Sequence, residues 1–110
     1  MSDNWLVVDD RVLATLEVAD GRRARRRGLL GREGIEGALL LRPARSVHTF
    51  GMRFAIDVAH LDREQRVVRT ATLKPGRLGA YVGRSRSVLE AEAGAFARWG
   101  LVEGDQVEFR

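Results

Sequence analysis

Short apolar runs separated by turn-forming residues recur along this whole chain, and they limit the folds that are open to it. Each run has the length of a single strand, and several alternate apolar with polar side chains, as half-buried strands do. Polar turns of a few residues join neighbouring runs, which favours hairpins and an antiparallel sheet. Strands are therefore predicted at residues 38–42, 46–50, 54–61, 66–73 and 87–94.

The two ends of the chain extend this pattern. Residues 5–18 are predicted to form a hairpin that turns at Asp9-Asp10. Residues 102–110 contain a turn at Gly104-Asp105 and then a final strand. With about seven or eight short strands in all, we expect the sheet to curl into a barrel.

Two further segments have helical character. Residues 21–32 follow Asp20, a residue type that caps helix N-termini, and Gly28 weakens this helix toward its end. Residues 95–100 form a second, shorter helical turn. The predicted fold class is therefore α+β: a single compact domain over residues 1–110, mostly antiparallel β-sheet curled into a partly closed barrel with two short helices.

Composition excludes several kinds of chemistry. The chain has no cysteine, which rules out disulfides, a thiol nucleophile, an iron–sulfur cluster and cysteine-based zinc sites. No apolar run approaches the roughly 20 residues that span a bilayer, and the N-terminal sequence lacks the basic start of a signal peptide. We therefore expect a cytoplasmic protein that makes no membrane contact.

Motifs for the commoner reactions are also missing from the sequence. There is no nucleoside-triphosphate loop and no serine-nucleophile elbow, so no catalytic motif is recognisable. The two histidines, His48 and His60, do not have the spacing of a helical metal-binding pair. No metal and no cofactor are expected, and His60 is expected to have a structural role at the edge of the core or to lie at the surface.

The charged residues are dominated by arginine. Lys74 is the only lysine among 19 basic side chains, and the formal net charge is +4. Arginine binds phosphate and carboxylate through paired hydrogen bonds, so the composition permits an anionic partner. A GC-rich genome would give the same bias without any such partner.

Five arginines are concentrated between Arg22 and Arg27, on the first predicted helix. Such a cluster suits phosphate or RNA. Aromatic residues make up only 6% of the chain, however, and none stands among these arginines, which argues against stacking on bases. A solvated helix face is the favoured interpretation, and nucleic acid is not the expected partner.

His48 and Asp57 are the pair that most resembles catalytic machinery. Asp57 shares its strand face with two apolar residues, so it is expected to be buried and to need a partner. Arg53, His48, Thr49 and the backbone of the glycine-rich segment 74–84 are the candidates. An aspartate that ties down a loop is favoured over a catalytic one, although the catalytic interpretation stays open.

Several motifs in a fixed order are more specific than any one residue. Arg25, "GLL" and Arg32 are followed by "GALLL", "VHTFGMRFAIDV", "HLD", "LKPGR", "VLEAEAG" and "GLVEGDQVEF". Together they resemble the bacterial and archaeal family called domain of unknown function 192, over roughly residues 12–109. The resemblance implies a compact, β-rich α+β single domain, and it implies no established activity.

The motif residues divide into two groups. Glycines, a proline and leucines are explained by packing and turns, whereas a second group is polar or polarisable and is not. If the strands curl together, this second group lines one pocket. It consists of Arg25, His48, Thr49, Met52, Arg53, Asp57, Arg77 and Glu90.

The leading functional hypothesis is a small binding or accessory module whose pocket accepts an anionic small molecule or a peptide terminus. Arginines supply positive charge, His48 and Thr49 supply hydrogen bonds, and Asp57 orients an arginine. One alternative is a small hydrolase-like enzyme in which Asp57 orients His48 as general base. Another is an RNA-binding protein that uses Arg22–Arg27.

Overall fold

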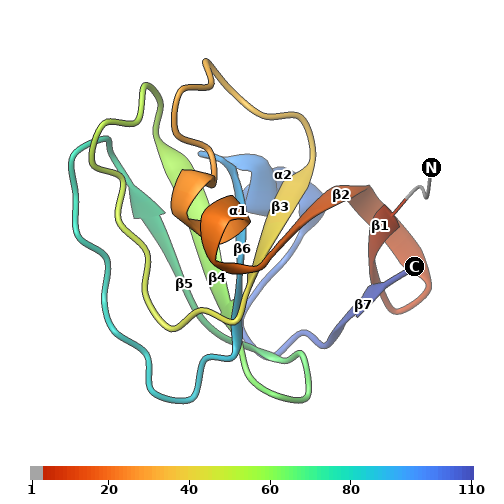
Figure 1. Cartoon of the computed structure of the whole chain (residues 1–110). Helices are drawn as coiled ribbons and strands as arrows, with labels where there is room; N and C mark the ends of the chain where they lie inside the picture. The colour runs from red at the N-terminus through yellow and green to blue at the C-terminus, as the bar shows by residue number, and fades with distance from the viewer. Residues whose placement is uncertain (1–3) are drawn as a thin grey trace.

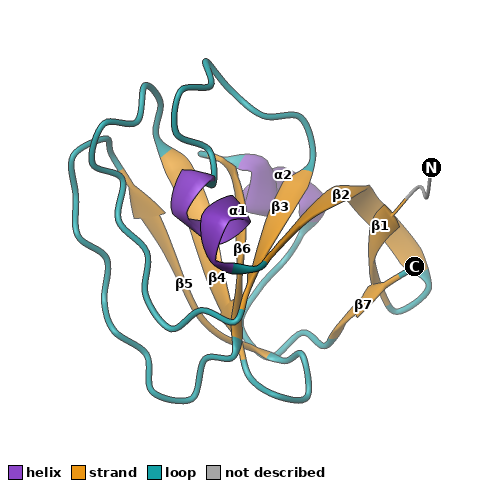
Figure 2. Cartoon of the chain, in the orientation of Figure 1, coloured by secondary structure: helices purple, strands orange, loops and turns teal. Residues whose placement is uncertain are grey.

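The computed structural model describes residues 4–110, which form one sheet of seven strands and two short helices (Figure 1; Figure 2). In chain order the elements are β1 Asn4–Val8, β2 Arg11–Asp20, α1 Arg22–Arg27, β3 Ala38–Arg42, β4 Ile56–Leu61, β5 Val67–Leu73, β6 Ser87–Glu92, α2 Ala95–Trp99 and β7 Val107–Phe109. The strand order across the sheet is β5-β4-β6-β3-β2-β1-β7. Neither helix is long and apolar enough to cross a membrane.

The sheet is antiparallel except for β2 and β3, which run parallel to each other. The connection between these two strands contains α1. Its two edge strands approach each other at one end. There the Val67 amide donates to the Asp105 carbonyl, and the Gly104 amide donates to the Val67 carbonyl. The predicted α+β fold with a partly closed barrel is therefore confirmed, as a half-barrel that is joined at one end.

The hairpin turns follow from local sequence. Asp9 and Asp10 both have positive φ, 51° and 62°, which the two-residue turn between β1 and β2 requires and which Asp tolerates better than most residues. In the turn between β4 and β5, the Asp62 carboxylate accepts hydrogen bonds from the amides of Glu64 and Arg66. The hairpin predicted at residues 5–18 is confirmed, and β4 and β5 form a second one.

The predicted strand at residues 46–50 is wrong. This segment forms only an isolated bridge between His48 and Leu78, and the rest of it is loop. Its alternating pattern is real, but the segment pairs with irregular residues of the following loop and not with a strand of the sheet. The Gly79 amide donates to Val47 and the Val82 amide to Arg45, so the segment runs beside residues 77–82 instead.

The first helix is shorter than predicted, and Asp20 does not cap it. Asp20 is the last residue of β2 and lies opposite Arg42 on β3, where its carboxylate accepts a hydrogen bond of 2.8 Å from the Arg42 Nε. Gly21 takes the N-cap position without a side-chain hydrogen bond. No residue of α1 is buried, and only Leu29, beyond its end, packs into the core.

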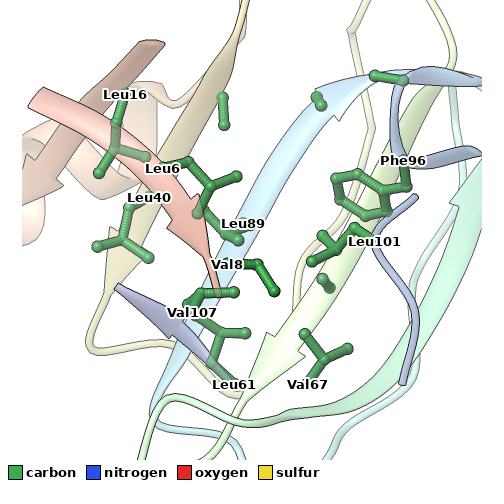
Figure 3. Close-up of a cluster of buried hydrophobic side chains, with 14 residues drawn as sticks. Leu6, Val8, Leu16, Leu40, Leu61, Val67, Leu89, Phe96, Leu101 and Val107 are labelled. Carbon is green, nitrogen blue, oxygen red and sulfur yellow. The ribbon is translucent and has the colours of Figure 1, made fainter. Parts of the chain in front are cut away.

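Two hydrophobic cores lie on opposite faces of the sheet. The first core fills the half-barrel and includes Leu6, Leu16, Leu40, Leu61, Leu89 and Phe96 (Figure 3). The second core includes Leu29, Leu39, Leu41, Ile56, Val58 and Val88. Strand β4 contributes to both, because Ala59 and Leu61 face the first core while Ile56 and Val58 face the second. The predicted division of this strand into two faces is confirmed.

Candidate functional site

A cleft of about 670 Å³ opens on the face of the sheet that carries the second core. One wall is α1 with the residues that follow it, and the other is formed by parts of the loops at 43–52 and 81–86. Leu29, Leu41 and Val47 supply apolar surface at its base. Figure 1 shows α1 over this face of the sheet. The volume is in the range of small-molecule sites.

Six arginines line this cleft from both walls. Four belong to α1 and two to the opposite loops: Arg22, Arg25, Arg26, Arg27, Arg45 and Arg86. Within residues 4–110 none of the six forms an ion pair with a carboxylate, whereas Arg32, Arg42, Arg53, Arg98 and Arg110 do. The cleft therefore concentrates positive charge that the described part of the chain does not neutralise.

The hydrogen bonds of these arginines leave donors free. Arg45 donates from Nε to the carbonyl of Ser85 at 3.2 Å, and Arg86 donates only to backbone carbonyls. The Nε of Arg25 is buried without a hydrogen-bond partner in residues 4–110. Since a buried donor without a partner is costly, this nitrogen is the most unusual polar atom of the cleft.

Glu90 is the single carboxyl group that lines the cleft. It stands on the central strand β6, between Leu39 of β3 and Val58 of β4, and is only 4% exposed. Within residues 4–110 its carboxyl group has no hydrogen bond and no ion pair. Burial disfavours the charged form and raises the pKa of Glu90 to about 7.

Gly28 covers this carboxyl group from the side of the helix. A Cβ at Gly28 would lie 3.9 Å from the Glu90 Oε1 and 3.6 Å from the Arg25 carbonyl oxygen. Gly28 also has a φ of +45°, a conformation that residues with a Cβ adopt rarely. The glycine thus turns the chain directly over Glu90 while leaving room beside the carboxyl group.

Apolar and aromatic side chains surround the mouth of the cleft. Leu30, Phe50 and Tyr81 line it although they are 45%, 51% and 70% exposed. The rings of His48 and Phe50 stack, with centroids 5.0 Å apart and planes inclined by 22°. The His48 Nδ1 accepts a hydrogen bond from the Phe50 amide, which fixes the imidazole beside the phenyl ring.

The pocket hypothesis brought eight residues together, and the structure places four of them in this cleft: Arg25, His48, Met52 and Glu90. The other four lie elsewhere. Thr49 is fully buried, and its hydroxyl donates to the Lys74 carbonyl and accepts from the Arg77 amide, so it joins two loops. Arg53 pairs with Glu33.

Asp57 lies on the other face of the sheet. One carboxylate oxygen accepts from the Thr72 hydroxyl at 2.7 Å, and the other accepts from the amides of Gly94 and Phe96 at 3.0 and 3.2 Å. The interpretation that Asp57 ties down a loop is confirmed, although none of the proposed partners was correct. The His48–Asp57 pair of the enzyme hypothesis is wrong, because Asp57 faces the first core and His48 lines the cleft over the second.

His60 is buried and has a structural role, as expected. Its Nδ1 lies 3.0 Å from the hydroxyl of Ser85, which in turn is within hydrogen-bond distance of the Ala44 and Ser87 carbonyls. Because the hydroxyl donates to a carbonyl, the imidazole is the donor in this pair. Burial, followed by the charge of Arg69, lowers the pKa of His60, so both favour the neutral form of the ring.

Four residues that line the cleft, Arg45, Phe50, Tyr81 and Arg86, were not among the predicted site residues. All four lie on irregular loops, where a strand pattern such as that of residues 46–50 does not give the direction of a side chain. Only tertiary structure brings these loops to α1. No group of three or more histidine, aspartate or glutamate residues in 4–110 is arranged to hold a metal ion.

Comparisons with known proteins support the fold. The family model DUF192, described as "Uncharacterized ACR", matches residues 6–109. A crystal structure of a protein of unknown function from Novosphingobium aromaticivorans aligns with a TM-score of 0.80 and 20% identity, over 96% of this chain and 83% of that one. No curated protein matches significantly.

A second solved structure gives a similar result. It is described as "a putative transcription regulator" from Sinorhizobium meliloti and aligns with a TM-score of 0.79 and 20% identity, over 97% of this chain and 92% of that one. At this identity both likenesses establish the fold alone. Any functional inference must therefore come from the cleft.

Proposed function

The chain belongs to the DUF192 family, an uncharacterized one, and we therefore propose a function from the cleft itself: binding of a small anionic ligand. The six unneutralised arginines on its two walls carry this proposal. Like charges held close together repel one another, so a negatively charged ligand is stabilised by all of them. Guanidinium groups also bind phosphate or carboxylate through paired hydrogen bonds.

The arrangement of the cleft favours a ligand-binding site and not merely a solvated helix face. Arg25 has a buried Nε without a partner, and Arg45 and Arg86 approach from the loops facing α1. An anion between the two walls would contact cations from both sides. A helix covered with arginine for solubility alone would not need the two opposing loop arginines.

Glu90 would tune this binding. When its carboxyl group is ionised, it neutralises part of the arginine charge and repels an anion from the floor of the cleft. When it is protonated, it offers a hydrogen-bond donor instead. Anion affinity is therefore expected to fall as pH rises through about 7, the pKa of Glu90.

The experiment is a thermal unfolding series with phosphate, pyrophosphate, citrate and a short acidic peptide at low salt. A ligand at 100 times its Kd stabilises the folded state by about 2.7 kcal/mol, so the Tm is expected to rise by several degrees. The double variant R22A/R26A should lose most of this shift. Arg63→Ala removes an exposed arginine of the β4–β5 turn and is the matched control, which should keep it.

Two results would contradict the proposal. One is the absence of any Tm shift with every anion in the series. The other is an equal loss of the shift in R22A/R26A and in Arg63→Ala, which would mean that general net charge, and not the cleft, attracts the anions.

A further inference from the structure

We infer that the anion bound in this cleft is a phosphate ester that carries a flat aromatic ring, the chemistry of a nucleotide. This inference rests on the proposed anion site and adds the aromatic side chains at the mouth of the cleft. The arginines account for the phosphate, and the stacked rings at the mouth account for the second half of the ligand.

The exposed aromatic residues are the first observation. Only three phenylalanine, tryptophan and tyrosine side chains in residues 4–110 are exposed, and two of them, Phe50 and Tyr81, line the cleft, while Trp5 lies elsewhere. They come from two separate loops, and exposed Leu30 completes the same rim. Exposed apolar surface gathered at a concave site indicates a ligand with an apolar part.

The His48–Phe50 stack is the second observation. The two rings are nearly parallel, and Phe50 remains 51% exposed although it contacts the imidazole. A flat exposed ring that is held in place by a neighbour is a platform on which a base stacks. Stacking needs only a π-face, so the pair recognises a ring without selecting a particular base.

The juxtaposition with arginine is the third observation. Proteins that bind nucleotides in single strands combine positive charge along the phosphates with aromatic platforms for the bases. Here no aromatic residue lies within the arginine cluster Arg22–Arg27, yet Phe50 and Tyr81 line the same cleft. The folded chain therefore brings to the arginines the aromatic side chains that their sequence neighbours lack.

The size of the cleft fits this ligand. About 670 Å³ accommodates a molecule of mononucleotide size, since small-molecule sites run from about 300 to 1,000 Å³. The same chemistry occurs in a free nucleotide and in a nucleotide of a single strand. The test below distinguishes these two sources.

The test is a calorimetric titration at low salt of the full chain with pyrophosphate, ribose 5-phosphate, the four ribonucleoside monophosphates and a ten-nucleotide single-stranded RNA. The monophosphates should bind about tenfold more tightly than ribose 5-phosphate, because only they carry a base that stacks on the exposed aromatic ring. Phe50→Ala should remove this gain while keeping the affinity for ribose 5-phosphate. Phe50→Trp should retain the gain.

Trp5→Ala removes an exposed aromatic residue away from the cleft and is the matched control, with no expected effect. Equal affinities for ribose 5-phosphate and the monophosphates, or an unchanged gain in Phe50→Ala, would overturn the inference and leave the anion site standing. Binding of no phosphate compound at all would overturn the anion site as well.

The RNA arm identifies the source of the nucleotide. Much tighter binding of the strand than of any monophosphate, with affinity that falls steeply with salt, assigns the site to single-stranded nucleic acid. Affinity for the strand no greater than for a monophosphate assigns it to a free nucleotide. Either result supports the aromatic phosphate ligand if Phe50→Ala weakens the binding, and an affinity for the strand that Phe50→Ala leaves unchanged would overturn it, because phosphate contacts alone would then explain the binding.

Discussion

Asp57 and Glu90 are buried carboxyl groups on neighbouring strands, and they differ in their hydrogen bonds. Asp57 faces the first core and accepts three hydrogen bonds, from Thr72, Gly94 and Phe96, so its charge is compensated. Glu90 lines the cleft on the other face and accepts none within residues 4–110. The first carboxylate stabilises the fold, whereas the second is available to a ligand.

Replacing Asp57 by alanine is expected to lower the free energy of unfolding by about 3 kcal/mol. The change leaves two amides and a hydroxyl without an acceptor, and each buried donor without a partner costs roughly 1–3 kcal/mol. Urea unfolding of Asp57→Ala, with Thr72→Val as the comparison that removes a single hydrogen bond, measures this. A loss below about 1 kcal/mol in Asp57→Ala would show that these hydrogen bonds do not hold the turn before α2.

Glu90 makes stability depend on pH. Its pKa rises from 4.5 to about 7 on folding, so the folded state holds the proton where the unfolded state has lost it. The free energy of unfolding therefore falls as pH rises from about 4.5 to about 7, by a total on the order of 3 kcal/mol. Chemical unfolding at a series of pH values, with Glu90→Gln beside the wild type, measures this slope.

His60 also makes stability depend on pH, but in the opposite direction, and it is present in both the wild type and Glu90→Gln. Its pKa is lowered on folding from 6.5, so protonation favours the unfolded state and stability decreases as pH falls below about 6.5. The difference between wild type and Glu90→Gln cancels this contribution. A difference that does not change between pH 4.5 and 7 would contradict the assignment of a raised pKa to Glu90.

Helix α1 has little support of its own. Six residues are too few for a stable isolated helix, five of them are arginine, and none is buried. The segment is held by Leu29 in the second core and by the ion pair of Arg32 with Glu17. Since like charges along the helix repel one another, an anion in the cleft would stabilise α1 as well as occupy the site.

Amide hydrogen exchange tests this at the level of the element. We expect residues 22–28 to exchange fast in the free protein and to become protected by about tenfold or more when pyrophosphate is bound, since an element without buried contacts opens at low free-energy cost. Strands β4 and β6 provide the internal control and should not change. Saturating binding without any added protection in α1 would contradict its role as a wall of the site.

Elements were predictable from sequence where local chemistry decides them. The Asp9-Asp10 turn is enough to predict the hairpin of β1 and β2. Strand β3 has the predicted bounds, because its first four residues form a continuous apolar run. Residues 46–50 alternate apolar with polar side chains as a strand does, but in the folded chain they pair with the loop at 77–82 and not with a strand. Asp20 is a residue type that caps helices, but its carboxylate pairs with Arg42 on the adjacent strand and not with the amides of α1. Such competition between partners is not visible in a single segment.

At the scale of the whole molecule, the half-barrel brings distant loops to one place. The sheet, α1 and the loops at 43–52 and 81–86 together make a cleft whose charge comes from both sides. Arg25, His48, Met52 and Glu90 were predictable through motif resemblance, since they stand in recognisable positions. Arg45, Arg86, Phe50 and Tyr81 were not, because only the tertiary arrangement of the loops directs them to one cleft.

Backbone amide NMR during a titration with pyrophosphate tests most directly that this cleft is the anion site. The account predicts that the largest chemical-shift changes occur in residues 22–30, 45–48 and 85–86, that they saturate, and that they are lost in R22A/R26A. Arginines on the far strand β5 and its turn, such as Arg63 and Arg69, should show no saturable change. Shift changes of equal size at all exposed arginines, or largest along β5, would contradict it.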